Sequence, residues 1–336
     1  MRRRRGFVLV IVVFFAALLF TGVATFLRRA TVDAFIARNR DQTARAEALA
    51  RGGVRLATAL VLQDLVEEQA QGRPPLETSQ DLWAAVSGVP LPVSDGGLLR
   101  VKIQDAGSRL NLNALFGEDA EADRREAFLT AFFEKVIEEM PGRPEEKLYD
   151  AGDLARNLVD YVDEDDVRLQ GGFEDDYYQQ QTPPYRAANR PLLSVDEIAL
   201  VEGFDGPLLE ALRPYLTVYP YAGGGGINPN TAPTWLLASL YVGTGSDYDL
   251  AGEDQVRAVL RSRDKGELLC PEDYALPACT FADPIVEGTI FPPPAWSSDV
   301  FRVEAEARYG DVRRSIETVI DRSDPVEPRF LAWRVR

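Results

Sequence analysis

Arg2-Arg3-Arg4-Arg5-Gly6-Phe7 opens an apolar run that continues without a charged residue or a proline to Leu27. In a helix that rises ~1.5 Å per residue, residues 7–27 would cover ~30 Å, about the thickness of the hydrocarbon core of a bilayer. The arginines before the run favour a cytoplasmic N-terminus, although Arg28 and Arg29 follow it. The segment therefore predicts one membrane helix, with the bulk of the chain outside the cytoplasm.

The position of Gly6 distinguishes this segment from an ordinary secretory signal. Such a signal has its small-residue cleavage site after the apolar region, whereas Gly6 lies before it. A cut after Gly6 would remove residues 1–6 as a leader and leave Phe7 as the new N-terminus. This arrangement resembles the class III signals of type IV pilins and pseudopilins, which a prepilin peptidase cleaves. A plain signal anchor with a fortuitous Gly-Phe pair is the alternative.

Ile11 occupies the fifth position of the chain that this cut would leave. Major pilins and pseudopilins carry a glutamate there, and the resemblance implies that its carboxylate pairs with the N-terminal amine of a neighbouring subunit. A carboxylate in lipid is costly unless it is paired. Ile11 removes both the cost and the pairing, which suits a subunit at the fibre tip. It is equally compatible with a simple lipid-facing residue.

The helical character continues beyond the membrane run to about residue 70. Good helix formers dominate from Ala30 to Glu68, and Gly52-Gly53 predicts a bend. We expect one helix over residues 7–70, apolar first and amphipathic afterwards. An unrelated stalk or coiled coil is the alternative, but no sustained heptad supports the latter.

Composition excludes several classes of function. The formal net charge of −16 argues against sequence-independent binding of nucleic acid and suits cations or basic partners. The sequence contains no histidine, which excludes His-based triads and His-ligated zinc. It also has no Walker-type loop and no GxSxG elbow, so a membrane-anchored hydrolase has little support. We expect that the chain is not an enzyme.

The two cysteines, Cys270 and Cys279, enclose a short loop. In an oxidising compartment they predict one structural disulfide, with two free thiols as the alternative.

The body of the chain alternates between two kinds of pattern. Strand-like alternation over residues 98–104, 215–219 and 299–321 predicts an antiparallel sheet whose last part is a hairpin. Helical periodicity dominates between the first two segments, with a capping box at residues 194–197. Asn230 predicts the cap of a helix over 231–240, and residues 253–263 predict another. The fold class is therefore α+β. Residues 71–115 and 214–336 would form a pilin-like α/β domain, and residues 116–213 an inserted all-helical domain.

Two carboxylate clusters lie within the predicted helical insertion, separated by Gly171-Gly172. Ca²⁺ takes six to eight oxygen ligands. A chain that folds back at the two glycines could bring both clusters around one ion, although the spacing of an EF-hand is absent. A solvated acidic loop is the alternative, and the paired carboxylates of a glycosidase match this clustering poorly. The candidate ligands are Asp163, Asp165, Asp166, Glu174, Asp175 and Asp176.

The segments around this loop carry a more specific resemblance. They are residues 158–166, residues 171–178, the stretch Pro184-Tyr185-Arg186-Ala187-Ala188-Asn189-Arg190-Pro191-Leu192, and residues 200–203, 213–217 and 227–232. Together they resemble type II secretion system protein K, a family of minor pseudopilins that also lacks the fifth-position glutamate. Residues 243–291 depart from the pattern, which puts the fold of that region in doubt.

The resemblance implies a pilin-like fold with an inserted helical domain and structural Ca²⁺ in the acidic loop. It implies a complex at the pseudopilus tip with the minor pseudopilins I and J. Further partners would be the major pseudopilin, the inner-membrane assembly platform and the prepilin peptidase. The complex would prime assembly of the pseudopilus for export of folded proteins across the outer membrane. The head of the chain would then be periplasmic.

Two other functions fit parts of the sequence. A minor pilin of a type IV pilus would have the same leader, but the helical insertion and the acidic loop favour secretion. Residues 227–232 and the helices after them also resemble a helix-hairpin-helix DNA-binding unit. Asp247, Asp249 and Glu253 would repel phosphate there, so we expect no nucleic-acid partner.

Overall fold

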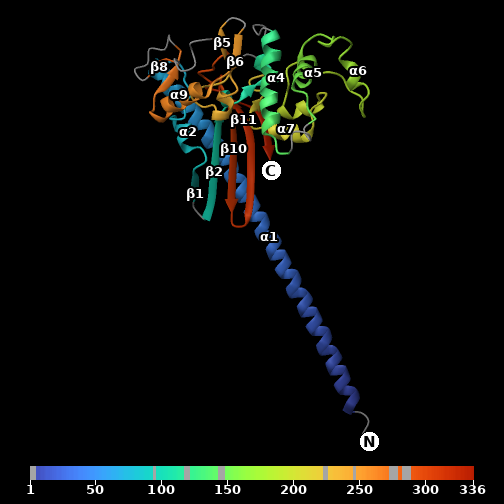
Figure 1. The fold of residues 1–336 in the computed structure, drawn as a ribbon. Coiled ribbons are helices and arrows are strands. Elements are labelled where there is room, and N and C mark those ends of the chain that lie inside the picture. Colours follow the sequence, from blue (N-terminus) through green and yellow to red (C-terminus); the bar gives the residue numbers. More distant parts are fainter. Residues whose placement is uncertain are drawn as a thin grey trace.

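The computed structural model describes residues 5–93, 96–116, 122–142, 148–221, 226–244, 247–271, 279–281 and 289–336. A long stalk helix carries a head made of a sheet and a helical region (Figure 1). The helices are α1 (Arg5–Ala70), α2 (Leu82–Val86), α3 (Leu112–Leu115), α4 (Ala122–Glu139), α5 (Ala151–Val162), α6 (Asp175–Tyr178), α7 (Gly206–Leu212), α8 (Thr234–Leu237) and α9 (Glu253–Asp264), with 3₁₀ turns η2 (Ala106–Ser108) and η4 (Val195–Leu200). The strands are β1 (Pro90–Val93), β2 (Gly97–Asp105), β3 (Leu110–Asn111), β4 (Leu216–Thr217), β5 (Tyr241–Thr244), β6 (Asp247–Leu250), β7 (Leu268–Cys270), β8 (Cys279–Phe281), β9 (Thr289–Phe291), β10 (Val300–Tyr309), β11 (Val312–Asp321) and β12 (Arg329–Val335).

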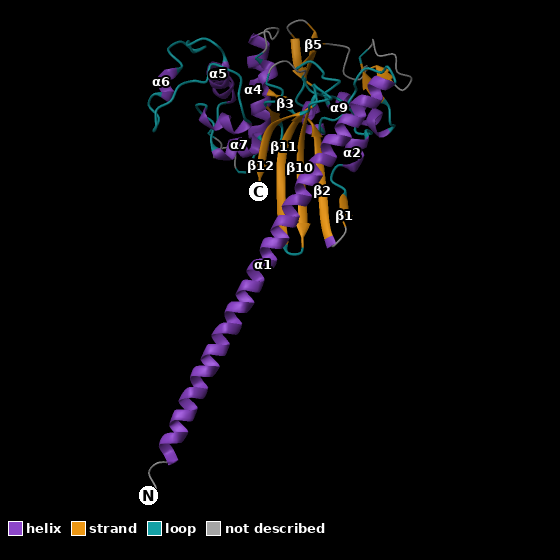
Figure 2. Cartoon of the chain, turned by 180° about the vertical axis from the view of Figure 1, so that it is seen from behind, coloured by secondary structure: helices purple, strands orange, loops and turns teal. Residues whose placement is uncertain are grey.

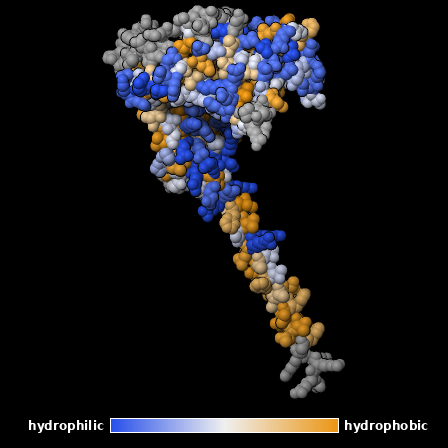
Figure 3. All heavy atoms as spheres, in the orientation of Figure 1, coloured by the Kyte–Doolittle hydropathy of each residue, from blue (hydrophilic) through white to orange (hydrophobic). Residues whose placement is uncertain are grey.

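The helix α1 has two halves with different surroundings. It is continuous over 66 residues, which corresponds to ~100 Å. Its first half projects away from the head, and apolar side chains cover the free end of the stalk (Figure 3). This half is long and apolar enough to cross a membrane. In the second half a buried face recurs every three or four residues, as expected for a helix packed on one side, at Ala46, Ala50, Val54, Ala57 and Val61.

The helix α1 crosses the sheet (Figure 2), and Gly53 lies at this contact, beside Leu99 and Ala305. A Cβ atom at this position would come within 2.8 Å of Leu99 Cδ1 and 3.0 Å of Ala305 Cβ. The residue therefore has no side chain because the helix approaches the strands closely. α1 runs through Gly52 and Gly53 without interruption, and the bend predicted there stays a prediction.

The sheet that α1 covers has the order β1-β2-β10-β11-β12 and is antiparallel throughout. The predicted hairpin is confirmed as β10 and β11, which turn at Gly310 with a φ of 60°. Phe301, Val303 and Ala305 of β10 belong to the cluster that packs against α1. The residues between them point to the opposite face of the sheet, because side chains alternate along a strand. The end of the chain forms the edge strand β12.

A second hydrophobic cluster fills the rest of the head. Phe128, Phe132 and Phe133 of α4 belong to it together with residues of α5, α7 and the segment after β4. The short parallel pair of β3 and β4 lies at the two ends of the helical region. Val256 and Leu269, which the sequence assigned to the sheet domain, belong to this same cluster. The division of the chain at residues 115 and 213 stays a prediction.

Two predicted helix caps do not form. The capping box before residue 198 does not form, because Ser194 makes no side-chain cap and η4 is a 3₁₀ helix. Asn230 does not cap a helix over 231–240; α8 begins only after Pro233, since proline disfavours helical backbone in the residue before it. The Asn230 side chain instead bonds both backbone groups of Leu269.

Candidate metal centre in the acidic loop

The acidic loop starts at the C-terminus of α5 and returns beside it. Asp163 is the residue at the C-terminal cap of that helix, and a bridge between Val167 and Phe173 closes the loop. Gly171 and Gly172 form the tip with φ values of 87° and 103°, a backbone region that glycine adopts without strain. The return at the two glycines, expected from the sequence, thus brings Asp163 close to Glu174.

Three carboxylates lie close together at the base of this loop, next to the C-terminus of α5. Oxygen atoms of Asp160, Asp163 and Glu174 all lie within 4.8 Å of one another. Glu174 is only 2% exposed, and neither of its oxygens nor Oδ1 of Asp163 has a hydrogen-bond partner. Buried oxygens without a donor are costly. A cation among these carboxylates would remove that cost, so the group could hold a metal ion.

The protonation of these carboxylates follows from their burial. Burial, followed by the negative charges of Asp163 and Asp160, raises the pKa of Glu174 to about 8. Burial, followed by the charges of Asp165 and Asp160, raises the pKa of Asp163 to about 6. A divalent cation reverses these shifts because it favours the ionised carboxylates.

The structure selects among the six ligands that the sequence suggested. Asp163 and Glu174 are in the buried group, and Asp160 joins them. Asp160 lies three residues before Asp163 on one helix face, a spacing that could have identified it. The other four lie outside this group. Asp165 accepts from the Val167 N–H, Asp166 from the Asn189 side chain, and Asp175 from the Ala187 N–H, while Asp176 is exposed.

Asn189 ties the Tyr-Arg-Ala-Ala-Asn-Arg-Pro segment to the loop. Its Nδ2 donates to the carbonyl oxygen of Asp165 at 2.8 Å, and its backbone N–H donates to that of Tyr161 at 3.1 Å. Its φ of 44° lies in the left-handed region, which asparagine tolerates better than most residues. Its buried Oδ1 has no hydrogen-bond partner. This segment therefore shapes the loop around the carboxylates.

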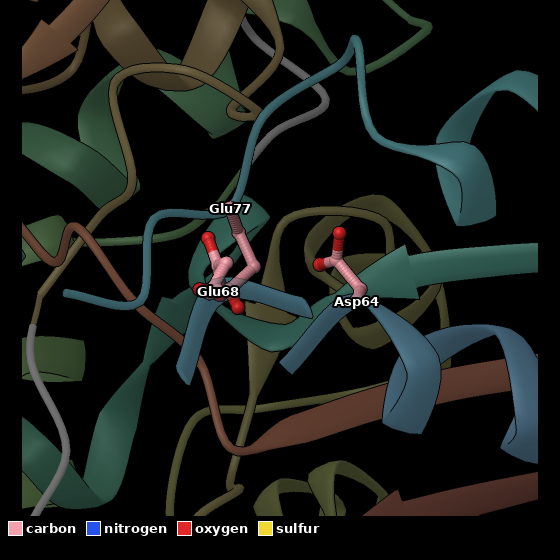
Figure 4. A group of neighbouring side chains, drawn as sticks. All are labelled: Asp64, Glu68 and Glu77. Carbon is pink, nitrogen blue, oxygen red and sulfur yellow. The ribbon is translucent and has the colours of Figure 1, made fainter. Parts of the chain in front are cut away.

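A second group of carboxylates lies where α1 meets the head (Figure 4). Asp64 and Glu68 come from α1, and Glu77 from the segment after it. The buried guanidinium of Arg322 pairs with Glu77, and its Nη1 lies 3.7 Å from Oδ2 of Asp64. By proximity this group could also hold a metal, but the fully buried Arg322 already pairs with it. In the acidic loop the nearest cation, Arg168, lies 3.8 Å from Oδ2 of Asp160 and leaves both Glu174 oxygens and Oδ1 of Asp163 without a partner. The acidic loop is therefore the stronger candidate. Sequence reasoning missed this second group.

The remaining predicted sites are described in part. Gly6 lies at the start of α1, and Phe7 and Ile11 are exposed on it; residues 1–4 of the leader lie outside the described residues. Cys270 is disulfide-bonded. The backbone of Cys279 lies in β8, but its side chain is outside the described residues, so its part in the pair stays a prediction.

Comparison with known proteins identifies the family. A family model described as type II secretion system (T2SS), protein K, matches residues 108–221, which include the acidic loop. The type II secretion system protein K of Aeromonas hydrophila is 30% identical over 282 residues, or 79% of this chain and 78% of that protein. The chain belongs to the type II secretion system protein K family. The sequence-based assignment is confirmed, and this pseudopilin family consists of non-enzymatic structural proteins.

Other protein K sequences match shorter stretches. Those of Pseudomonas aeruginosa and Klebsiella pneumoniae are each 30% identical, over 57% and 64% of this chain. The matches span 54% and 62% of those two relatives.

The fold is similar to that of a solved structure. The crystal structure of the GspK-GspI-GspJ complex from the enterotoxigenic Escherichia coli type 2 secretion system contains a chain that matches with a TM-score of 0.59 and 19% identity. The match covers 89% of this chain and 99% of that one. It confirms the predicted α+β fold with a long N-terminal helix, an antiparallel sheet and a helical region.

Proposed function

We propose that this member of the protein K family is a minor pseudopilin at the tip of a type II secretion pseudopilus. There it primes assembly together with other minor pseudopilins for the export of folded proteins across the outer membrane. The observation that carries this proposal is the division of α1. Its first half is apolar and exposed, whereas its second half is buried against a sheet. Such a stalk anchors a head to a membrane and leaves it free to assemble with others.

The partners proposed are the minor pseudopilins I and J, as in the complex named for the solved relative. Between the apolar run and the sheet, α1 exposes Val32, Phe35 and Ile36. Their spacing places them on one face of the helix, where a neighbouring helix could cover them. The major pseudopilin and the inner-membrane platform would contact the assembled tip. Ile11 offers no carboxylate for a subunit above, which suits the terminal position.

The location proposed is the bacterial inner membrane, crossed once by residues 7–27, with a cytoplasmic N-terminus and a periplasmic head. The prepilin peptidase would cleave after Gly6. Replacing Gly6 by leucine should leave the leader on the chain, seen as slower migration and an uncleaved N-terminus by mass spectrometry. Gly22→Leu is the matched control, because a side chain at Gly22 meets no atom within 4 Å. Normal cleavage of Gly6→Leu would refute this processing.

The ion proposed for the acidic loop is Ca²⁺. All donors in the group are carboxylate oxygens, the ligands that hard cations prefer, and the sequence has no histidine. Asp160, Asp163 and Glu174 would hold the ion, which would neutralise their charges and fix the loop to α5. The role proposed for the ion is therefore structural.

The test is reconstitution of the tip. The whole chain, in detergent micelles, is mixed with proteins I and J from the same genome, with Ca²⁺ or with EDTA. Co-elution of the three chains supports the proposal, and a weaker complex in EDTA links the ion to assembly. Failure to co-elute under both conditions would reject the tip role. Co-elution with minor pilins of a type IV pilus would assign the chain to that machine instead.

A further inference from the structure

A cavity of about 300 Å³ lies on the face of the sheet opposite α1. Arg302 of β10, Val319 of β11 and Ala332 of β12 form one side of it. Cross-strand pairing places these three residues next to one another. The other side comes from the helical region of the head, through Asp196 of η4, and from Thr217 of β4 at its end. The cavity therefore sits in the angle between the sheet and the helical region.

The charge of this cavity is opposite to that of the chain. Asp196 pairs with Arg213 and lies 3.4 Å from Arg334, so two cations share one carboxylate. Arg213 also lies 3.1 Å from Glu210, which is outside the lining. Glu317 is shared in the same way by Arg302 and by Arg336, which is 3.2 Å away. The lining arginines are Arg109, Arg213, Arg302, Arg334 and Arg336. Positive charge thus exceeds negative charge here, in a chain whose net charge is −16.

The third acidic residue of the lining does not balance this excess. Asp105 accepts hydrogen bonds from the Gly107 N–H, from Asn228 and from Thr231. Burial raises the pKa of Asp105. Even with Asp105 ionised, the five lining arginines outnumber the three lining carboxylates.

Arg109 is the cation that this arrangement leaves without a carboxylate. Its two hydrogen bonds go to neutral oxygens, Oε1 of Gln104 at 3.1 Å and the carbonyl of Arg213 at 3.2 Å. Burial, followed by the positive charge of Arg302, lowers the pKa of Arg109 to about 10, and the carboxylate of Glu317 opposes this only in part. In addition, the buried Nε of Arg213 has no hydrogen-bond partner. A desolvated guanidinium without a counterion is unfavourable, so an anion would complete this cavity.

The cavity also has apolar walls and adjoins a free strand edge. Leu216 and Val300 contribute to its lining. In the part of the chain that the structure describes, β12 ends the sheet and no strand pairs with its outer edge. An extended peptide can add to such an edge, with alternate side chains entering a pocket. Guanidinium groups recognise carboxylates through paired hydrogen bonds.

We propose that this cavity binds a carboxylate on an extended acidic segment of a partner protein, with an apolar residue beside it. The carboxylate would lie between Arg109 and Arg213, and the segment would run along β12. This inference does not depend on the proposed place at the pseudopilus tip, because it rests on the cavity alone.

The test is calorimetric titration of the whole chain in detergent micelles. The probes are an acetylated peptide that alternates valine and glutamate, the same peptide with glutamine, glutarate and inorganic phosphate. We expect the glutamate peptide to bind and the glutamine peptide not to bind. Arg109→Gln should weaken binding by ~10-fold or more, because it removes a charged hydrogen-bond partner. Arg257→Gln, on the exposed face of α9, is the matched control and should leave binding unchanged.

Two further results decide between explanations. If glutarate or phosphate binds as tightly as the peptide, the assignment to a protein segment is overturned. If no probe binds, or if Arg109→Gln binds equally well, the carboxylate site itself is overturned.

Without ligand, Arg109→Gln should melt at the same temperature or higher, since the lost charge was uncompensated. A lower melting temperature would indicate a structural role. Arg336→Gln, at the exposed rim, should weaken binding several-fold and tests the site independently.

Discussion

The side chain of Arg322 pairs with the carboxylate of Glu77, 245 positions away in the sequence, and both side chains are fully buried. The same guanidinium donates from Nη1 to the carbonyl oxygen of Val61 in α1 at 2.6 Å. It also donates from Nε to the carbonyl of Ser298, just before β10. One side chain thus joins the stalk helix, the segment after it and the sheet.

Removing the carboxylate of this pair should be strongly destabilising. Glu77→Gln leaves the guanidinium of Arg322 buried and poorly compensated, and we expect the free energy of unfolding to fall by ~3–5 kcal/mol. Denaturant unfolding of the whole chain in micelles measures this loss. Glu47→Gln is the control, because Glu47 pairs with Arg51 on the exposed side of α1 and such helix pairs contribute only ~0.3–0.5 kcal/mol. Equal effects of the two substitutions would contradict the structural role of Arg322.

Glu68, beside this pair, should make stability depend on pH. Burial raises the pKa of Glu68 from 4.5 to about 7, and its Oε2 has no hydrogen-bond partner. Because the folded chain holds this proton more tightly than the unfolded chain, the contribution of Glu68 is complete below pH 4.5. It is lost as the pH rises to about 7. Glu68→Gln should therefore gain stability relative to the natural chain across this interval.

Melting temperatures of both proteins between pH 4.5 and pH 8 test this expectation. Glu67→Gln is the control, since Glu67 is exposed on the same turn of α1. A constant difference between Glu68→Gln and the natural chain at every pH would show that Glu68 does not titrate in this range.

Local signals explain which features were predictable. The apolar run of α1 and the alternation of β10 and β11 are patterns within one element, so the sequence predicts them directly. Asp163 and Glu174 were predictable because the two glycines between them indicate a turn. The ion pair of Arg322 and Glu77 was not predictable, because no sequence pattern near either residue indicates the other. The arginine-lined cavity is likewise assembled from distant segments.

The acidic loop should stabilise the head only when a cation is present. At a Ca²⁺ concentration ~100 times the dissociation constant, binding to the folded state alone adds ~2.7 kcal/mol to the free energy of unfolding. We therefore expect EDTA to lower the melting temperature and Ca²⁺ to restore it. Asp163→Asn combined with Glu174→Gln should abolish the response, and Asp176→Asn, at an exposed neighbour, should retain it. A full response in the double variant would place the ion elsewhere, for which Asp64 and Glu77 are the next candidates.

The two adjacent glycines of α1 should respond in opposite directions to the same substitution. At Gly53 an added Cβ atom would lie 2.8 Å from Leu99 Cδ1, so Gly53→Ala forces the helix away from the sheet and should cost ~1–3 kcal/mol. At Gly52 no atom lies within 4 Å of an added Cβ. Gly52→Ala should therefore stabilise the chain by ~0.5–1 kcal/mol through the better helix propensity of alanine. Denaturant unfolding measures both, and a stabilising Gly53→Ala would show that α1 lies farther from β2 than described.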